Sequence, residues 1–327
     1  MIATDTITRR VMLGGAVVAT SGAMAAGPAR AASATKPRTS VPAGTCDSHV
    51  HVLDPARFPF MARRAYTPGP ATVAQMSAMH AVLGIARVVV VQNSVYGSDN
   101  ACLLDALAQL GPKIARGVAT IDAKTTAQEI HAMDRAGVRG VRLNLEVSKE
   151  RDPAGAGAAL DIAPMLPPHW HIHINAALPV LVAIRARIAG VGKTVVLDHF
   201  AHIPAAGGTG QPGFAEIVAL MRTGKVIVKF SGPYQVSKQP GYGDIAPIAR
   251  ALVAAAPRQV IWGSDWPHTG GSNRPADQSL DVIEAFRPED DGANFDLLAT
   301  WVPNPTERRR VLVETPAALY GFGSARG

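Results

Sequence analysis

The stretch "RVVVVQNS", residues 87–94, is an unbroken β-branched run that ends in polar side chains. A strand without alternation of apolar and polar residues is typical of a parallel sheet that is covered on both faces. Parallel strands end at the same edge of a sheet, so the polar end indicates where such a fold would carry chemistry. The stretch therefore predicts an α/β protein with functional groups at its strand ends.

Seven further runs of this kind alternate along the chain with segments of helical periodicity. Eight strand–helix units in about 280 residues favour a closed (β/α)8 barrel, the TIM barrel, over an open sheet. The final stretch, 305–322, is expected to form a helix that covers one end of the barrel. The predicted strands are 45–52, 87–94, 115–121, 138–145, 170–175, 194–199, 226–231 and 259–265, and the predicted helices are 72–83, 100–110, 127–136, 178–189, 214–222 and 244–255.

Residues 1–34 are predicted to be a targeting signal. Arg9 and Arg10 precede a short apolar segment, and small-residue cleavage patterns end at Ala31 or Ala34. The twin arginine is typical of a Tat signal, with a Sec signal or an uncleaved anchor as alternatives. We therefore expect a bacterial, periplasmic protein in which residues 35–44 are a linker and residues 45–327 form a single domain.

The composition argues against several classes of partner. No uncharged apolar run of 18 residues follows the N-terminus, so we expect no membrane span in the mature chain. The formal net charge is +7, but the positive residues are dispersed and aromatics make up only 5%, which argues against nucleic-acid binding. An anionic small molecule suits this balance better. We expect a monomer or a small homo-oligomer, with Cys46 and Cys102 as separate buried thiols rather than a disulfide.

Four residues with catalytic chemistry lie at predicted strand ends. His49 and His51 are two residues apart on the first strand and therefore share a face. His199 ends the sixth strand and Asp265 ends the eighth. We expect all four to converge at the barrel mouth, where imidazoles can hold a divalent metal and a carboxylate can take a proton from water. Taken alone, the His-x-His pair could also be two hydrogen-bonded core histidines.

These residues resemble the amidohydrolase superfamily, through "HVH" (49–51), "DH" (198–199) and "GSDWPH" (263–268). Within it, the chain is similar to the 2-pyrone-4,6-dicarboxylate lactonases and the 4-sulfomuconolactone hydrolases, with further likeness in "AGVRGVRLNL", "VIVKFSG" and "PAALYGF". The resemblance implies that water attacks a lactone carbonyl with Asp265 as general base. It also implies that the three histidines and Asp265 bind a divalent metal, zinc being favoured, or that the histidines polarise the carbonyl directly without metal.

A second set of residues is predicted to bind the substrate. Arg142 is expected to face inward beside Asn144 and hold a carboxylate or sulfonate, with an internal salt bridge as the alternative. Lys229 on the seventh strand is left open between an anion contact and a structural role. The full predicted set is Arg142, Ser94, Asn144, Asn175, His173, His202 and His268.

Departures from the lactonase pattern bear on the substrate. Ser148 and Gln235 stand where the dicarboxylate lactonases carry arginines, and Asn175 replaces a tyrosine. Charge-assisted hydrogen bonds contribute ~1.5–3 kcal/mol each, so the loss of two arginines should weaken dianion binding by several kcal/mol. The resemblance therefore favours 4-sulfomuconolactone, hydrolysed to maleylacetate and sulfite, over the dicarboxylate pyrone.

Two other classes of function remain open. One is a non-oxidative decarboxylase of an aromatic or unsaturated acid on the same fold. Such enzymes carry a metal-binding histidine at the fifth strand, and His173 keeps this alternative open. The other is a binding protein on a degenerate barrel, which the inward set of three histidines and an aspartate argues against, because burying unused ionisable groups is costly.

Overall fold

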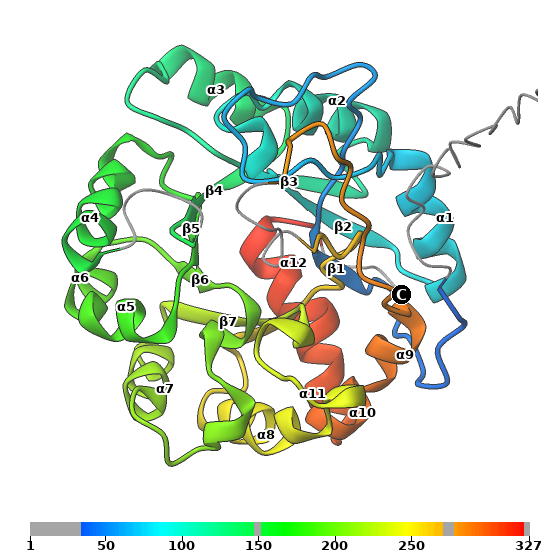
Figure 1. Ribbon diagram of the computed structural model, residues 1–327. Coiled ribbons are helices and arrows are strands. Elements are labelled where there is room, and N and C mark those ends of the chain that lie inside the picture. The colour runs from blue at the N-terminus through cyan, green and yellow to red at the C-terminus, as the bar shows by residue number, and fades with distance from the viewer. Residues whose placement is uncertain (1–33, 147–151, 271–277, 324–327) are drawn as a thin grey trace, which may run out of the picture.

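The computed structural model describes residues 34–146, 152–270 and 278–323, and Figure 1 shows a ring of strands surrounded by helices. Eight parallel strands follow one another around the sheet in chain order. The predicted (β/α)8 barrel is confirmed. The strands are β1 Cys46–Val50, β2 Arg87–Val91, β3 Ala115–Ala119, β4 Val138–Asn144, β5 His171–Asn175, β6 Val195–Leu197, β7 Val226–Phe230 and β8 Val260–Trp262.

The barrel closes just beyond the end of β8, against β1. The backbone N–H of His51 donates to Trp266 O at 2.8 Å, and that of Asp265 donates to His49 O at 2.9 Å. At Gly263 a Cβ atom would lie 2.6 Å from His49 Cβ, so only glycine permits this approach. The closure therefore brings the histidines of the first strand next to Asp265.

The helices follow the predicted pattern, with differences at their ends. Thr72 and Thr126 begin α1 and α3 with capping boxes, which satisfy the first backbone N–H groups. The predicted helix 178–189 is divided at Ile184 into two short helices. The helices of the barrel are α1 Val73–Leu83, α2 Ala101–Leu110, α3 Ala127–Arg135, α4 Pro153–Ala158, α5 Leu178–Ala183, α6 Arg185–Gly190, α7 Phe214–Arg222 and α8 Ala246–Ala255.

The C-terminal part comprises α9 Asp291–Asp296, α10 Leu298–Trp301, α11 Pro305–Arg309, a π-helical turn Arg310–Glu314 and α12 Thr315–Tyr320. Of these, α9 contacts α1 and α10 contacts α8, whereas α12 covers the end of the barrel opposite the catalytic face. Tyr320 and Phe322 pack against inward-facing strand residues such as Val89, Val196 and Ile227. Side chains two apart on a strand share a face, so the residues above this apolar layer also point inward. The apolar layer thus forms a floor beneath the polar residues at the strand ends.

The segment before β1 is held by hydrogen bonds. The backbone N–H of Thr35 donates to Asp290 Oδ1 at 2.9 Å, and that of Thr39 donates to Asp296 Oδ1 at 2.7 Å. The segment predicted as a linker is therefore fastened to α9. Residues 1–33 of the predicted signal, which include Arg9, Arg10 and Ala31, lie outside the described residues, as does Ser148.

Cys46 and Cys102 are both buried and free, as predicted. Among the described residues, no helix has the length and apolar character needed to cross a membrane.

Candidate active site

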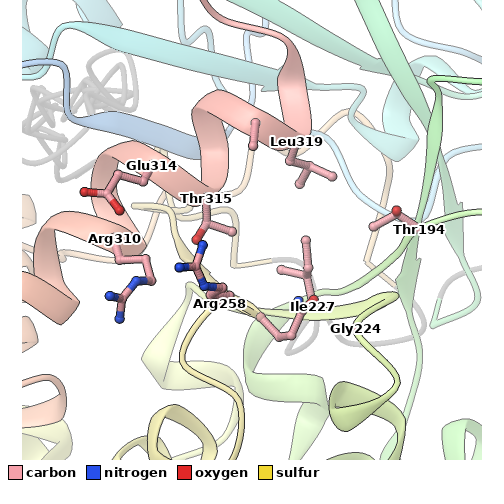
Figure 2. Close-up of a pocket in the computed structure, with 10 residues that line it drawn as sticks. Thr194, Gly224, Ile227, Arg258, Arg310, Glu314, Thr315 and Leu319 are labelled. Atoms are coloured by element: carbon pink, nitrogen blue, oxygen red, sulfur yellow. The ribbon is translucent and has the colours of Figure 1, made fainter. Parts of the chain in front are cut away.

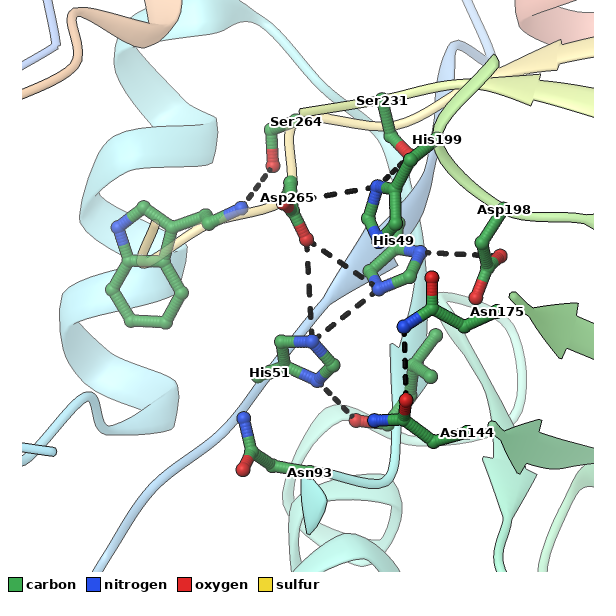
Figure 3. A network of polar contacts seen from close by, with 12 residues as sticks. His49, His51, Asn93, Asn144, Asn175, Asp198, His199, Ser231, Ser264 and Asp265 are labelled. Atoms are coloured by element: carbon green, nitrogen blue, oxygen red, sulfur yellow. Dashed lines mark hydrogen bonds and ion pairs between the residues drawn. The ribbon is translucent and has the colours of Figure 1, made fainter. Parts of the chain in front are cut away.

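The four predicted catalytic side chains lie together at the carboxyl ends of β1, β6 and β8 (Figure 3). His49 Nε2 is 3.3 Å from His51 Nε2 and 3.5 Å from Asp265 Oδ1. His199 Nδ1 lies 3.9 Å from Asp265 Oδ2 and 3.0 Å from the hydroxyl of Ser231. The structure therefore brings together the group that the sequence pointed to, around a common space.

Two of these residues have unusual backbone conformations. His199 has φ 50° and Asp265 has φ 69°, in the left-handed region that non-glycine residues rarely adopt. Such conformations persist only where the surrounding structure holds them, and they cluster at functional sites. They explain why the predicted strands 194–199 and 259–265 end early, at Leu197 and Trp262.

The protonation of His51 follows from its contacts. Its Nδ1 lies 2.7 Å from the backbone oxygen of Val91. A carbonyl oxygen only accepts, so Nδ1 carries the proton and Nε2 presents a lone pair to the site. Burial, with a smaller contribution from Arg142, lowers the pKa of His51 to about 3, so the ring is neutral near pH 7.

Asp265 has the properties of a general base. Burial raises its pKa to about 6, and the Tyr234 hydroxyl, which donates to Oδ2 at 2.6 Å, opposes this rise. The donor on Oδ2 leaves Oδ1 as the oxygen that faces His49 and His51. A carboxylate with a pKa near the working pH is suited to accept a proton from water.

Tyr234 was missed by the sequence reasoning. It lies in the short turn Pro233–Gln235 after β7, which begins at Gly232 with φ 52°. The guanidinium of Arg287 lies 4.6 Å from the centre of its ring. In the sequence, Tyr234 could be recognised as a candidate only because it stands three residues after Ser231. That spacing does not show where the turn directs the hydroxyl.

A fully buried charged cluster lies beside the four residues. Lys229 Nζ is 2.9 Å from Asp198 Oδ1, and Arg142 Nε donates to Asp198 Oδ2 at 3.1 Å. Burial acts to raise the pKa of the Asp198 carboxyl, but Lys229 and then His49 more than offset it and hold that pKa well below its usual range. Arg142 thus makes the internal salt bridge that the sequence left open as the alternative to anion binding.

His173 does not join the catalytic group. Its Nδ1 lies 3.1 Å from Lys229 Nζ, and its side chain is fully buried. In this structure the ring contacts Lys229, and the predicted substrate contact of His173 stays a prediction. The His173 ring points into the barrel, as predicted, but at that height the side chain of Lys229 fills the barrel interior.

Three other predicted substrate residues form one hydrogen-bonded chain. His202 Nε2 lies 2.6 Å from Asn175 Oδ1, and Asn175 Nδ2 donates to Asn144 Oδ1 at 2.9 Å. An amide oxygen only accepts, so His202 Nε2 carries a proton and the chain runs in one direction, towards Asn144. Asn144 is half-buried.

The last two predicted substrate residues differ from each other. Ser94 is half-buried and begins the turn Ser94–Tyr96, directly after β2. His268 is 1% exposed and its Nε2 lies 3.0 Å from Asp291 Oδ1. Burial acts to lower the pKa of His268, but the Asp291 carboxylate raises it above its usual value. His268 is therefore part of a buried ion pair, and its predicted place in the lining of the site stays a prediction.

Two groups of described residues have the spacing of a metal site: His49, His51 and Asp265, and His49, Asp198 and His199. In the first group the facing atoms are 3.3, 3.5 and 4.0 Å apart. A tetrahedral ion with bonds of about 2.0–2.1 Å holds its ligands roughly 3.4 Å apart, so the spacing could accommodate one. In the second group, Lys229 Nζ already lies 3.0 Å from His49 Nδ1 and 2.9 Å from Asp198 Oδ1.

A separate cavity of about 360 Å³ lies at the opposite end of the barrel (Figure 2). Thr194, Arg258 and Leu319 line it, from the starts of β6 and β8 and from α12. TIM-barrel enzymes place catalysis at the carboxyl ends of their strands, so this cavity is not the candidate site.

Comparisons with known proteins agree with this fold. A 2-pyrone-4,6-dicarboxylate hydrolase of Comamonas testosteroni is 34% identical, over 88% of this chain and 94% of the relative. A 4-sulfomuconolactone hydrolase of Hydrogenophaga intermedia is 30% identical, over 87% of this chain and 91% of the relative. A ligand-free crystal structure of an Agrobacterium tumefaciens protein matches with a TM-score of 0.69 and 26% identity, over 88% of this chain and 99% of that protein. The profile of the Amidohydrolase family matches residues 46–322, and the chain belongs to that family.

Proposed function

We propose that the protein hydrolyses the ring ester of an anionic lactone, with Asp265 as the general base. The observation that carries the proposal is the position of Asp265 Oδ1, which is 3.5 Å from His49 Nε2 and 4.0 Å from His51 Nε2. A water on Oδ1 would therefore lie beside imidazole groups that can contact a carbonyl. Hydrolase activity is also what the names of the two relatives state for those proteins.

The steps follow from these contacts. Asp265 Oδ1 takes one proton from water, and the oxygen of that water bonds to the lactone carbonyl carbon. An imidazole N–H stabilises the oxyanion that forms on the carbonyl oxygen. The bond between this carbon and the ring oxygen then breaks, and the ring oxygen takes the proton back from Asp265. Tyr234 keeps its hydrogen bond to Oδ2 throughout, which holds the carboxylate in place.

The chain from His202 through Asn175 to Asn144 supports an anionic substrate. Asn144 Oδ1 accepts from Asn175, which leaves the Asn144 amide nitrogen to donate to a carboxylate or sulfonate oxygen. Gln235, exposed in the turn after β7, supplies a neutral side chain where the dicarboxylate lactonases carry an arginine. This argues against the dicarboxylate pyrone, and the similarity to 4-sulfomuconolactone hydrolases makes 4-sulfomuconolactone the first alternative to test.

A direct assay tests the proposal. Purified protein is given 4-sulfomuconolactone, 2-pyrone-4,6-dicarboxylate or the uncharged γ-butyrolactone, and proton release is followed with a pH indicator. We expect the best anionic lactone to exceed the neutral one in kcat/KM by about 10- to 100-fold, the range that one charge-assisted contact supplies. Sulfite release distinguishes the first substrate from the second, and Asp265→Asn is the control that should be inactive.

The same assay addresses the decarboxylase alternative. That function requires a fifth-strand histidine in the metal group, whereas His173 lies against Lys229, fully buried. Release of carbon dioxide from an unsaturated acid, with no proton release from any lactone, would favour the decarboxylase and refute lactone hydrolysis.

We also propose that the chain is exported through the Tat route. The support is the pair Arg9–Arg10 ahead of a short apolar segment. Periplasmic fractions should contain the protein, and a variant with Arg9→Lys and Arg10→Lys should remain in the cytoplasm. Equal export of both proteins would exclude this route.

A further inference from the structure

Lys229 lies inside the barrel and contacts three acceptors. It is fully buried on β7, and its Nζ is 2.9 Å from Asp198 Oδ1, 3.0 Å from His49 Nδ1 and 3.1 Å from His173 Nδ1. An ammonium group has three N–H donors and no acceptor. Two of these donors are used on the histidine nitrogens, and the third contact, with Asp198 Oδ1, is an ion pair.

The charges around Lys229 favour a protonated, charged ammonium group. Asp198 is fully buried and faces two cations, Lys229 at 2.9 Å and Arg142 at 3.1 Å. A buried carboxylate without a paired charge would be strongly destabilising. The pairing therefore keeps the carboxylate and the ammonium both charged within the barrel.

The protonation of His49 follows from this contact. Because Lys229 donates to Nδ1, a neutral His49 carries its own proton on Nε2. Figure 3 shows His49 Nε2 on the opposite side of the ring from Nδ1, where it faces His51 and Asp265. His51 Nε2 presents a lone pair there, because its Nδ1–H is bound to Val91 O. A donor on His49 thus meets an acceptor on His51, and the two independent assignments agree.

We infer that Lys229 is a positioning residue that holds His49 in the tautomer with the proton on Nε2, so that His49 faces the substrate as a hydrogen-bond donor. This inference rests on the proposed lactone hydrolysis, in which that N–H is the group that stabilises the oxyanion. Lys229 itself, buried behind the ring, does not touch the substrate.

The same arrangement disagrees with the zinc that the resemblance implies. A nitrogen that carries a proton cannot bind a metal, so His49 Nε2 is not a ligand while Lys229 donates to Nδ1. The other spacing suited to a metal, between His49 Nδ1 and Asp198, is taken by the ammonium. The contacts favour the alternative in which the imidazoles polarise the carbonyl without metal.

Replacing Lys229 should reverse the tautomer. In Lys229→Met, His49 Nδ1 is left with Asp198 Oδ1, 3.6 Å away, as its neighbour. A proton on Nδ1 can then donate to that carboxylate, which frees the lone pair on Nε2. This is the carboxylate–histidine arrangement that orients metal-binding histidines. The variant should therefore gain zinc affinity while losing catalysis.

The tautomer can be read without any substrate. Histidine labelled with ¹⁵N gives NMR signals that distinguish protonated from unprotonated ring nitrogens, and His49→Gln assigns the signals of His49 by their loss. In the unaltered protein we expect a protonated Nε2 and an unprotonated Nδ1. A proton on Nδ1 in that spectrum would overturn the inference, whether or not the Lys229 variant folds.

Zinc titration by calorimetry gives a second readout. We expect Lys229→Met to bind zinc at least about tenfold more tightly than the unaltered protein, the scale of a change beside a metal ligand. Its kcat should fall while KM for the lactone changes little. Tight zinc binding by the unaltered protein, or no tautomer change in a folded Lys229→Met, would refute the role of Lys229. Because the NMR and zinc measurements need no lactone, they hold even if the proposed substrate class is wrong.

Discussion

Removing the Tyr234 hydroxyl should move the pH dependence of catalysis. That hydroxyl donates to Asp265 Oδ2 at 2.6 Å and lowers a pKa that burial raises to about 6. A hydrogen bond to a charged group contributes ~1.5–3 kcal/mol, and one pKa unit corresponds to ~1.4 kcal/mol. In Tyr234→Phe the pKa of Asp265 should therefore rise by about one to two units.

The direction in which the pH profile of activity moves follows from the role of the Asp265 carboxylate. A general base must be ionised, so activity is lost as the pH falls through its pKa. The acidic limb of kcat/KM should shift from about pH 6 in the unaltered protein to roughly pH 7–8 in the variant. At pH 7 the variant should be about two- to tenfold slower, and it should recover at higher pH.

Tyr242→Phe is a matched control. Its hydroxyl donates to Glu289 Oε1 at 2.7 Å, so the variant also loses a bond between a tyrosine and a carboxylate, but away from Asp265. The control should keep the acidic limb in place. If Tyr234→Phe lowers activity equally at every pH, with an unmoved limb, then Tyr234 does not tune Asp265 and the assignment of the base is wrong.

Three further variants test other parts of the structure. Asp265→Asn should abolish turnover. Because burial raises the pKa of this carboxyl from 3.8 to about 6, the unaltered protein should lose about 2 kcal/mol of stability between pH 4 and pH 7 that the variant keeps, as urea unfolding at both pH values would show. Arg142→Ala leaves Asp198 with Lys229 as its remaining cation and should cost about 3 kcal/mol of stability, so an unchanged melting temperature would contradict the buried salt bridge. Asp296→Ala removes the acceptor for Thr39 N and should cost about 1–2 kcal/mol while kcat stays the same; loss of activity would show that the N-terminal segment influences the site.

The barrel could be predicted because its signals are local. A continuous run such as "VVVV" at 88–91 reports burial on both faces, and the order of such runs determines the sheet order of a barrel. Strand ends were less predictable. His199 was placed at the end of the sixth strand, but β6 ends at Leu197 and His199 lies on left-handed backbone. Only the contacts around such a residue hold it in that conformation.

The site was predictable in its members but not in its pairings. Alternation along a strand showed that Arg142 and His173 point inward, yet it could not show which charge each would meet. Asp198 was noted only as part of "DH", although it is the carboxylate that engages both Arg142 and Lys229. Pairing depends on which strands lie opposite one another at the same height in the barrel, and a single sequence does not contain that information.

The barrel interior divides its charges into a fixed layer and a reactive layer. In the fixed layer, two cations, Lys229 and Arg142, both pair with the single buried carboxylate of Asp198. In the reactive layer, burial lowers the pKa of His49, His51 and His199, so these rings stay neutral near pH 7. Asp265, whose pKa is raised to about 6, is the member of the catalytic group that changes charge there. The fixed layer orients His49 through Lys229, whereas the backbone oxygen of Val91 orients His51 and the Ser231 hydroxyl contacts His199. The rings are thus held in place before substrate arrives, which is the condition under which hydrogen bonds stabilise an oxyanion most effectively.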